Sequence, residues 1–182
     1  MITARDMEVI EFIERFKVAR TSTIKELFYP SLLVAQKRLK RITEDKELKR
    51  SRDNITNEYI YFKNKPKQLK HSLLITDFYR EFNKLVDINH FKNEFIIEGV
   101  RADALMAYEY KATKYISFLE VQISNVKLNL DKYRSLKYSE AYKKILPVFP
   151  SIIAVTNQRI EIPKDLEVIQ IKEDLSNAPL FG

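Results

Sequence analysis

The scarcity of glycine restricts the fold of this chain more than any other feature of its sequence. Only Gly99 and Gly182 occur among 182 residues. Phosphate-binding loops, dinucleotide-binding fingerprints and nucleophile elbows each require glycines at fixed spacings, so the sequence excludes all three. The chain also has no cysteine, which excludes disulfides, zinc ribbons and thiol catalysis. Two histidines, His71 and His90, are too few for a histidine-based metal site unless carboxylates contribute.

The excess positive charge of the chain lies in its first part. Residues 1–70 contain 17 Lys and Arg against 10 Asp and Glu, whereas residues 71–182 contain 15 of each. The whole net charge of +7 therefore precedes residue 71. Such asymmetry favours an anionic partner for one half of the chain, most often nucleic acid. A solvated, lysine-rich surface is the alternative that the charge count leaves open.

Apolar segments in this sequence are short. None approaches the ~18 residues that a membrane-spanning helix needs, so we expect no membrane association. Residues 1–6 do not have the composition of a signal peptide. Together with the lack of cysteine, these features predict a cytoplasmic protein.

Three helices are expected in the first 44 residues. Thr3 can cap a helix that ends near Phe16, and residues 21–23 offer caps for a second, shorter helix. After Pro30, Ser31 can cap a third helix that runs to about residue 44. Two short helices joined by a tight turn, after an introductory helix, predict a helix-turn-helix.

The third helix has two contrasting faces. We expect its apolar side to consist of Leu32, Ala35, Leu39 and Ile42. Basic and amide side chains occupy the other side, namely Gln36, Lys37, Lys40 and Arg41, with Arg38 at the border. Such a face suits the major groove of DNA, where Arg and Lys donate to guanine or phosphate and Gln pairs with adenine. The alternative is a surface helix whose lysines only keep it solvated.

A β-hairpin should follow these helices. Residues 48–52 and 58–62 have strand patterns, and residues 53–57 between them are typical of a turn. The first strand carries three cations that could meet the DNA backbone or minor groove, Lys49, Arg50 and Arg52. Three helices and a hairpin predict a winged helix-turn-helix DNA-binding domain over residues 1–66. Winged helices that bind only protein are the main alternative.

The second half should be a mixed α/β domain spanning residues 67–182. A polar connector precedes an expected helix near residues 72–85, and the periodicity then changes to that of strands. The expected order is three strands (91–98, 101–110 and 115–123), a helix (128–145) and two strands (151–156 and 166–171). We expect the strand at 151–156, whose residues 152–155 are all apolar, to lie inside the sheet.

Two acidic residues fall on adjacent strands of this predicted sheet. Asp103 lies near the start of one strand and Glu120 lies inside the next, among residues suited to burial. Because a buried carboxylate needs a partner, the pair could bind Mg²⁺ for phosphodiester hydrolysis. The alternatives are that Glu120 faces solvent or pairs with Arg101 or Lys132.

Short motifs in the second half resemble the replication-relaxation family of plasmid and mobile-element proteins. These motifs are Val100–Leu105, Phe118–Gln122 and Lys132–Arg134. The resemblance implies a restriction-endonuclease-like core in which Asp103 and Glu120 hold the metal. Gln122 stands where such cores usually have lysine, and since glutamine does not titrate, water activation would fall to the metal, Lys127 or Lys132. We therefore expect a core that keeps the fold but has lost or weakened the chemistry.

The leading hypothesis is a double-stranded-DNA-binding accessory protein of a plasmid or mobile element. It would act in DNA replication, relaxation or transfer and would need no cofactor. Its second half would form a homodimer or contact a relaxase or replication protein. One alternative is a Mg²⁺-dependent endonuclease that uses Asp103, Glu120 and Gln122, targeted by the winged helix. Another is a transcription regulator whose second half dimerises or senses a ligand.

Overall fold

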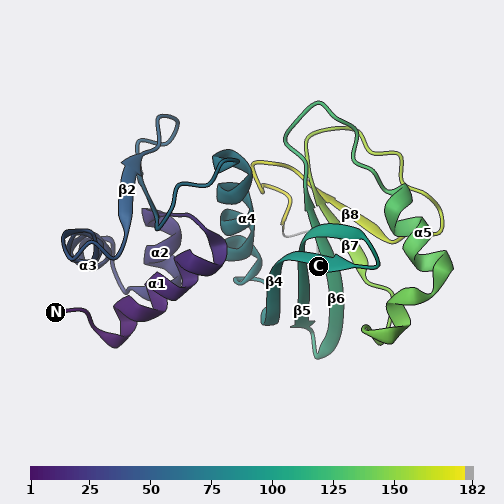
Figure 1. Ribbon diagram of the computed structural model, residues 1–182, viewed down its shortest axis with the longest axis horizontal. Helices are drawn as coiled ribbons and strands as arrows, with labels where there is room; N and C mark the ends of the chain where they lie inside the picture. The colour runs from purple at the N-terminus through teal and green to yellow at the C-terminus, as the bar shows by residue number, and fades with distance from the viewer. Residues whose placement is uncertain (179–182) are drawn as a thin grey trace. The chain divides into compact units, whose positions relative to one another are not determined.

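The computed structural model describes residues 1–178 and has a mixed α+β fold with five α-helices and two sheets. The chain divides into two compact units (Figure 1). Unit 1 comprises Met1–Arg80, and unit 2 begins at Glu81. The division falls near the end of helix α4 (Leu69–Phe82), and the sequence-based boundary at 66/67 lies just before that helix.

The helices of unit 1 begin and end close to the predicted positions. Helix α1 (Ala4–Phe16) has Thr3 as its N-cap, and Thr3 and Asp6 form a reciprocal capping box. Helix α3 (Leu32–Glu44) is capped by Ser31, whose hydroxyl accepts a hydrogen bond from the Val34 amide. Both predicted helices are therefore confirmed.

The predicted caps of the second helix are wrong. Helix α2 (Thr21–Phe28) already includes the three hydroxyl residues, and its N-cap is Arg20, which makes no side-chain cap hydrogen bond. The hydroxyls serve tertiary contacts instead. Thr21 donates to the Tyr59 carbonyl at 3.0 Å, and Thr23 donates to Asp77 at 2.9 Å.

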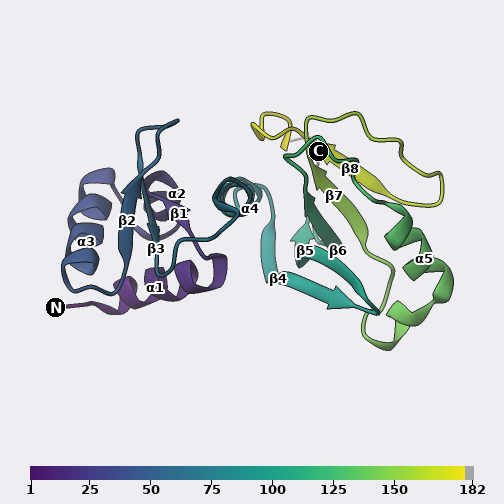
Figure 2. The same ribbon diagram turned by 45° about the horizontal axis from the view of Figure 1, so that its top comes forward.

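A three-stranded antiparallel sheet completes unit 1. It contains β1 (Ala19–Arg20), β2 (Lys49–Arg52) and β3 (Tyr59–Phe62) in the order β1-β3-β2. The predicted hairpin is confirmed as β2–β3. Strand β1 was not predicted, because two residues are too few to show the alternating pattern of a strand. Figures 1 and 2 both draw β2 beside α3.

A buried ion pair joins α1 to α3. The Asp6 side chain is fully buried and accepts hydrogen bonds from the Arg38 guanidinium and, at 2.8 Å, from the Tyr29 hydroxyl. Burial alone would raise the pKa of Asp6, but the hydrogen bonds from Arg38, Thr3 and Tyr29 hold it well below its ordinary value. Arg38, at the border of the predicted DNA-facing side, therefore stabilises the fold.

Unit 2 is built on a five-stranded mixed sheet. Its strands are β4 (Asp87–Ile97), β5 (Val100–Tyr110), β6 (Thr113–Val121), β7 (Ser151–Val155) and β8 (Val168–Ile171), in that spatial order. The first three pair antiparallel, and β6, β7 and β8 run parallel (Figure 2). The apolar strand β7 is paired on both sides, as its composition predicts.

The helix predicted over 128–145 is shorter and interrupted. Helix α5 (Asp131–Ser139) is followed by a 3₁₀ turn at Ala141–Lys144. The break lies at Glu140, whose left-handed φ of 56° ends the helix. Tyr133 of α5 packs its ring 5.0 Å from the ring of Phe118 of β6, so α5 covers the face of the sheet that carries the even-numbered residues of β6.

No helix within residues 1–178 combines the length and apolar character needed to cross a bilayer. The longest helix in this described part of the chain is α4, which has 14 residues. A span of the hydrocarbon layer takes about 20 residues.

Candidate functional site

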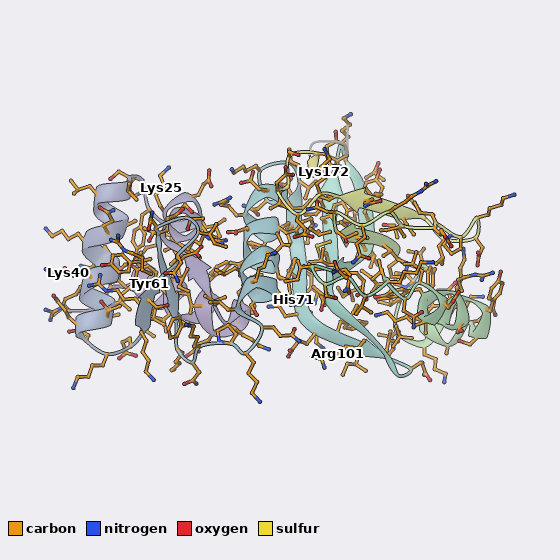
Figure 3. The ribbon with its side chains drawn as sticks, turned by 90° about the horizontal axis from the view of Figure 1, so that it is seen from above. Lys25, Lys40, Tyr61, His71, Arg101 and Lys172 are labelled. Atoms are coloured by element: carbon orange, nitrogen blue, oxygen red, sulfur yellow. The ribbon has the colours of Figure 1, made fainter. Side chains whose placement is uncertain are left out.

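The first candidate site is the exposed side of α3. All four predicted residues on this side are solvent-exposed, namely Gln36, Lys37, Lys40 and Arg41. The opposite side is fully buried at Ala35, Leu39 and Ile42. Lys40, labelled in Figure 3, projects away from the core of unit 1. The helix therefore presents one basic and amide face to solvent.

Leu32 does not belong to the buried side as predicted. It is 50% exposed, and its neighbour Leu33 is 76% exposed. The periodicity placed Leu32 with Ala35, but the first turn of α3 extends beyond the part of the helix that meets the core. The exposed face of α3 thus starts with an apolar turn and continues with basic residues.

Two of the cations on α3 have acidic neighbours within the same helix or at its end. Lys40 lies 3.8 Å from Glu44, and Arg41 lies 3.1 Å from Asp45. Exposed pairs of this kind are worth only about 0.3–0.5 kcal/mol, so a phosphate could replace either carboxylate. Lys37 has no acidic partner among residues 1–178.

The predicted cations of the hairpin lie on β2 and are exposed. They are Lys49, Arg50 and Arg52. The guanidinium carbon of Arg50 lies 4.4 Å from the centre of the Tyr59 ring, and that of Arg52 lies 5.1 Å from it. Contact with the ring orients both cations but leaves their donors accessible to an anion. All seven predicted DNA-binding residues therefore lie on two elements of unit 1.

The second candidate site is the carboxylate pair of unit 2. The register that pairs Ala104 with Leu119 places Asp103 of β5 next to Glu120 of β6, on the same face of the sheet. Asp103 accepts a hydrogen bond of 2.7 Å from the Val121 amide. Glu120 is buried, with 8% of its surface exposed. Asp103 and Glu120 therefore lie side by side on adjacent strands, as predicted.

A lysine and a tyrosine from α5 occupy one oxygen of Glu120. The Lys132 ammonium lies 2.6 Å from Glu120 Oε1 and also donates to the Arg101 carbonyl at 2.6 Å. The Tyr133 hydroxyl donates to the same carboxylate oxygen. The sequence left Lys132 open as a partner of Glu120, but it held no signal for Tyr133 beyond its place beside that lysine.

The surroundings of Glu120 shift the pKa of its carboxyl group above the ordinary value. Burial raises the pKa of Glu120, hydrogen bonds from Lys132 and Tyr133 lower it, and the negative charge of Asp103 raises it again. The net direction is upward. Burial and the same two carboxylates also raise the pKa of Tyr133, so its hydroxyl is a hydrogen-bond donor at neutral pH.

Gln122 and Lys127 contact other groups. The Gln122 side chain donates to the Ser124 hydroxyl, and its backbone amide donates to the Val155 carbonyl at 2.9 Å. Lys127 lies 3.6 Å from Glu161. Of the two lysines considered as substitutes for the missing one at position 122, only Lys132 contacts Glu120.

An open cavity of about 720 Å³ lies elsewhere in unit 2, between the start of α5 and residues 158–165. The Asp103–Glu120 pair does not line it. Within residues 1–178, no three His, Cys, Asp or Glu side chains lie close enough together to hold a metal ion. Mg²⁺ bound here would rely on two carboxylates, water and substrate oxygens, a set that Mg²⁺ commonly uses.

Neither a protein-family model, nor a curated protein, nor a solved structure matches this chain. The functional interpretation therefore depends on the chemistry of the α3 face, the β2 cations and the carboxylate pair.

Proposed function

We propose that the protein binds double-stranded DNA through unit 1, with α3 in the major groove and the β2–β3 hairpin against the adjacent backbone or minor groove. The supporting observation is the exposed face of α3, on which an amide and three cations lie opposite a fully buried apolar side. Cations neutralise phosphates and read guanine, and an amide pairs with adenine.

The order of elements agrees with a winged helix. Three helices are followed by a hairpin whose first strand carries the cations, and Figures 1 and 2 draw that strand beside α3.

For unit 2 we propose a restriction-endonuclease-like core. Three antiparallel strands are followed by a helix and a parallel strand, and two acids lie on adjacent strands. Its role would be self-association, or contact with a relaxase or replication protein during replication, relaxation or transfer of a mobile element.

The test measures the affinity of the full chain for a 30-base-pair duplex by fluorescence anisotropy. The double substitution Lys37→Ala/Arg41→Ala should weaken binding about 30-fold or more, because it removes two base or phosphate contacts worth about 1–3 kcal/mol each. The matched control is Lys111→Ala/Lys114→Ala, which removes the same charge from exposed positions of unit 2. Equal affinities of the two double variants would refute the proposed interface.

A specific observation favours a second function, Mg²⁺-dependent phosphodiester hydrolysis. The Lys132 ammonium lies 2.6 Å from Glu120 Oε1. It therefore provides the positive charge that a lysine at position 122 would provide in related cores, where this chain has Gln122. Asp103 and Glu120 would hold the ion, and the bound ion would supply Lewis acidity and an activated water. Lys132 would oppose the effect of burial by lowering the pKa of Glu120, and it would offset negative charge at the reacting phosphate.

Supercoiled plasmid incubated with Mg²⁺ or Mn²⁺ tests this second function. The unmodified protein should nick the plasmid, and Asp103→Asn and Lys132→Met should each abolish nicking. Gln122→Ala is the matched control within the motif and should retain activity, because Gln122 bonds Ser124 instead of the carboxylates. Failure of the unmodified protein to nick, or equal nicking by all variants, would exclude hydrolysis at this pair.

A further inference from the structure

The tip of the β2–β3 hairpin exposes one large apolar side chain. Ile55 is 83% exposed, and among the large hydrophobic residues within 1–178 only Met1 is more exposed. Its neighbours in the turn are polar and uncharged, namely Asn54, Thr56 and Asn57. The hairpin thus ends in an isoleucine flanked by amide and hydroxyl groups.

Hydrogen bonds order this turn. The Asp53 amide donates to the Glu58 carbonyl at 2.8 Å, and the Asn57 amide donates to the Asp53 carbonyl at 2.9 Å. The Asp53 carboxylate accepts from the Ile55 amide at 3.2 Å and from the Thr56 hydroxyl at 2.9 Å. Asn57 adopts a left-handed φ of 56°, which asparagine tolerates better than most residues. Ile55 is therefore held at the tip by a defined backbone.

Asp53 is the one acidic residue of the turn at 53–57, and its negative charge is paired with an arginine. Arg20 of β1 donates to the Asp53 carboxylate, with Nη2 at 3.1 Å from Oδ2. Burial raises the pKa of Asp53, but hydrogen bonds from Ile55, Thr56 and Arg20 outweigh it and lower the pKa below its ordinary value. The carboxylate stays ionised and paired, so the turn does not present an unpaired negative charge to a polyanion.

The strand leading to the tip has the opposite character. Lys49, Arg50 and Arg52 are exposed along β2, and both arginines lie over the Tyr59 ring. The hairpin is therefore cationic along its length and neutral at its end. This pattern matches the minor groove, where phosphates line the rims and base edges offer acceptors for amides.

From this pattern we propose that the turn at 53–57 enters the minor groove of bound DNA and that Ile55 wedges between two base pairs, so that the protein bends the duplex. The proposal rests on the proposed function of unit 1. Isoleucine is among the apolar residues that proteins insert between base steps, and such insertions kink DNA by roughly 20–90°. A single exposed side chain beside three cations is too small an apolar surface for a protein partner.

Two measurements on one 30-base-pair duplex test the proposal. The duplex has a central TA step, which unstacks easily, with dyes at both ends for energy transfer and 2-aminopurine beside the step. Binding of the unmodified protein should increase both energy transfer and 2-aminopurine fluorescence. Ile55→Ser should abolish both increases while affinity falls less than about tenfold, because the phosphate contacts remain. Ile55→Met should retain the bend.

The matched control is Ile96→Ser, which changes another exposed isoleucine, 62% exposed, on β4 of unit 2. It should bend and bind as the unmodified protein does. Bending by Ile55→Ser equal to that of the unmodified protein, or tight binding without any bend, would overturn the wedge but leave DNA binding by α3 intact. Failure of the proposed function is recognised separately, by equal DNA affinities of Lys37→Ala/Arg41→Ala and its control Lys111→Ala/Lys114→Ala. That result would overturn the wedge as well.

Discussion

Unit 1 and unit 2 each contain a buried carboxylate that is held by one basic side chain and one tyrosine. In unit 1, Asp6 is bound by Arg38 and Tyr29. In unit 2, Glu120 is bound by Lys132 and Tyr133. The partners are of the same chemical types, yet the pKa of Asp6 is lowered and that of Glu120 is raised.

Burial raises the pKa of both carboxylates, and the net direction depends on how far their other neighbours oppose it. Asp6 also accepts from the backbone and hydroxyl of Thr3, which stabilise its charge. At Glu120, burial outweighs the hydrogen bonds from Lys132 and Tyr133, and the negative charge of Asp103 raises the pKa further. A carboxylate whose charge is satisfied by hydrogen bonds stabilises a fold, whereas a buried carboxylate beside a second acid is more common at sites that bind a cation or transfer protons. Asp6 therefore has a structural role, and Glu120 remains a candidate functional residue.

The largest effect is expected for Asp6→Asn. It leaves Arg38 without its buried partner and should lower the free energy of unfolding by about 3–5 kcal/mol. Urea denaturation followed by hydrogen-exchange mass spectrometry would localise the loss to peptides of unit 1. The control is Glu8→Gln, because Glu8 forms only an exposed ion pair with Arg5. Loss of stability similar to that control would contradict the structural role of Asp6.

A smaller contrast is expected between Tyr29→Phe and Tyr133→Phe. Each substitution removes one hydroxyl that donates to a buried carboxylate and adds no volume. Tyr29→Phe should cost about 1.5–3 kcal/mol, the usual range for a hydrogen bond to a charged group. Tyr133→Phe should cost less, about 1 kcal/mol, because Glu120 is easier to protonate. A larger loss of unfolding free energy for Tyr133→Phe than for Tyr29→Phe, measured by chemical denaturation, would contradict this expectation.

Glu120→Gln should be milder still, with a loss of no more than about 1 kcal/mol. Glutamine keeps an oxygen that can accept from Lys132 and Tyr133, and it removes the repulsion with Asp103. Thermal unfolding of Glu120→Gln beside Asp6→Asn measures the contrast directly. A loss as large as that of Asp6→Asn would show that the charge of Glu120 is as well satisfied as that of Asp6.

The smallest effect is the pH dependence of the same variants, and it has opposite signs in the two units. The lowered pKa of Asp6 stabilises unit 1 above its ordinary value near 4, and this stability is lost as the pH falls below that value. The raised pKa of Glu120 contributes stability at low pH that is lost as the pH rises through the folded-state pKa. As the pH falls towards 4.5, the ordinary pKa of glutamate, the unmodified protein should therefore gain stability relative to Glu120→Gln but not relative to Asp6→Asn. Equal gains would contradict the assignment.

Local patterns predicted much of the fold. Capping residues and apolar spacing located α1 and α3, and alternation located the hairpin and the strands of unit 2. The helix α4 was expected at 72–85 and lies at Leu69–Phe82, since polar residues at its start do not reveal a boundary. Strand alternation also placed Asp103 and Glu120 side by side, because adjacent antiparallel strands fix which residues share a face.

Contacts between residues far apart in the chain could not be predicted from the sequence. Asp6 and Arg38 lie 32 residues apart, and periodicity marks neither as a buried partner of the other. The hydroxyls at 21–23 looked like caps because local rules do not include a distant carboxylate such as Asp77. For the same reason the sequence could not choose between Lys127 and Lys132 as the lysine near Glu120, and the position of α5 shows that it is Lys132.

Arg20 orders the turn of the hairpin in the absence of any ligand. Its guanidinium bonds Asp53 of the turn and Asp77 of α4, so one side chain ties the turn to a helix of unit 1. Ordering a mobile side chain on binding costs about 0.5–1.5 kcal/mol, and a turn that is ordered beforehand avoids this entropic loss for each of its residues. Arg20, which would touch no ligand, would thereby increase the affinity of the hairpin for its partner.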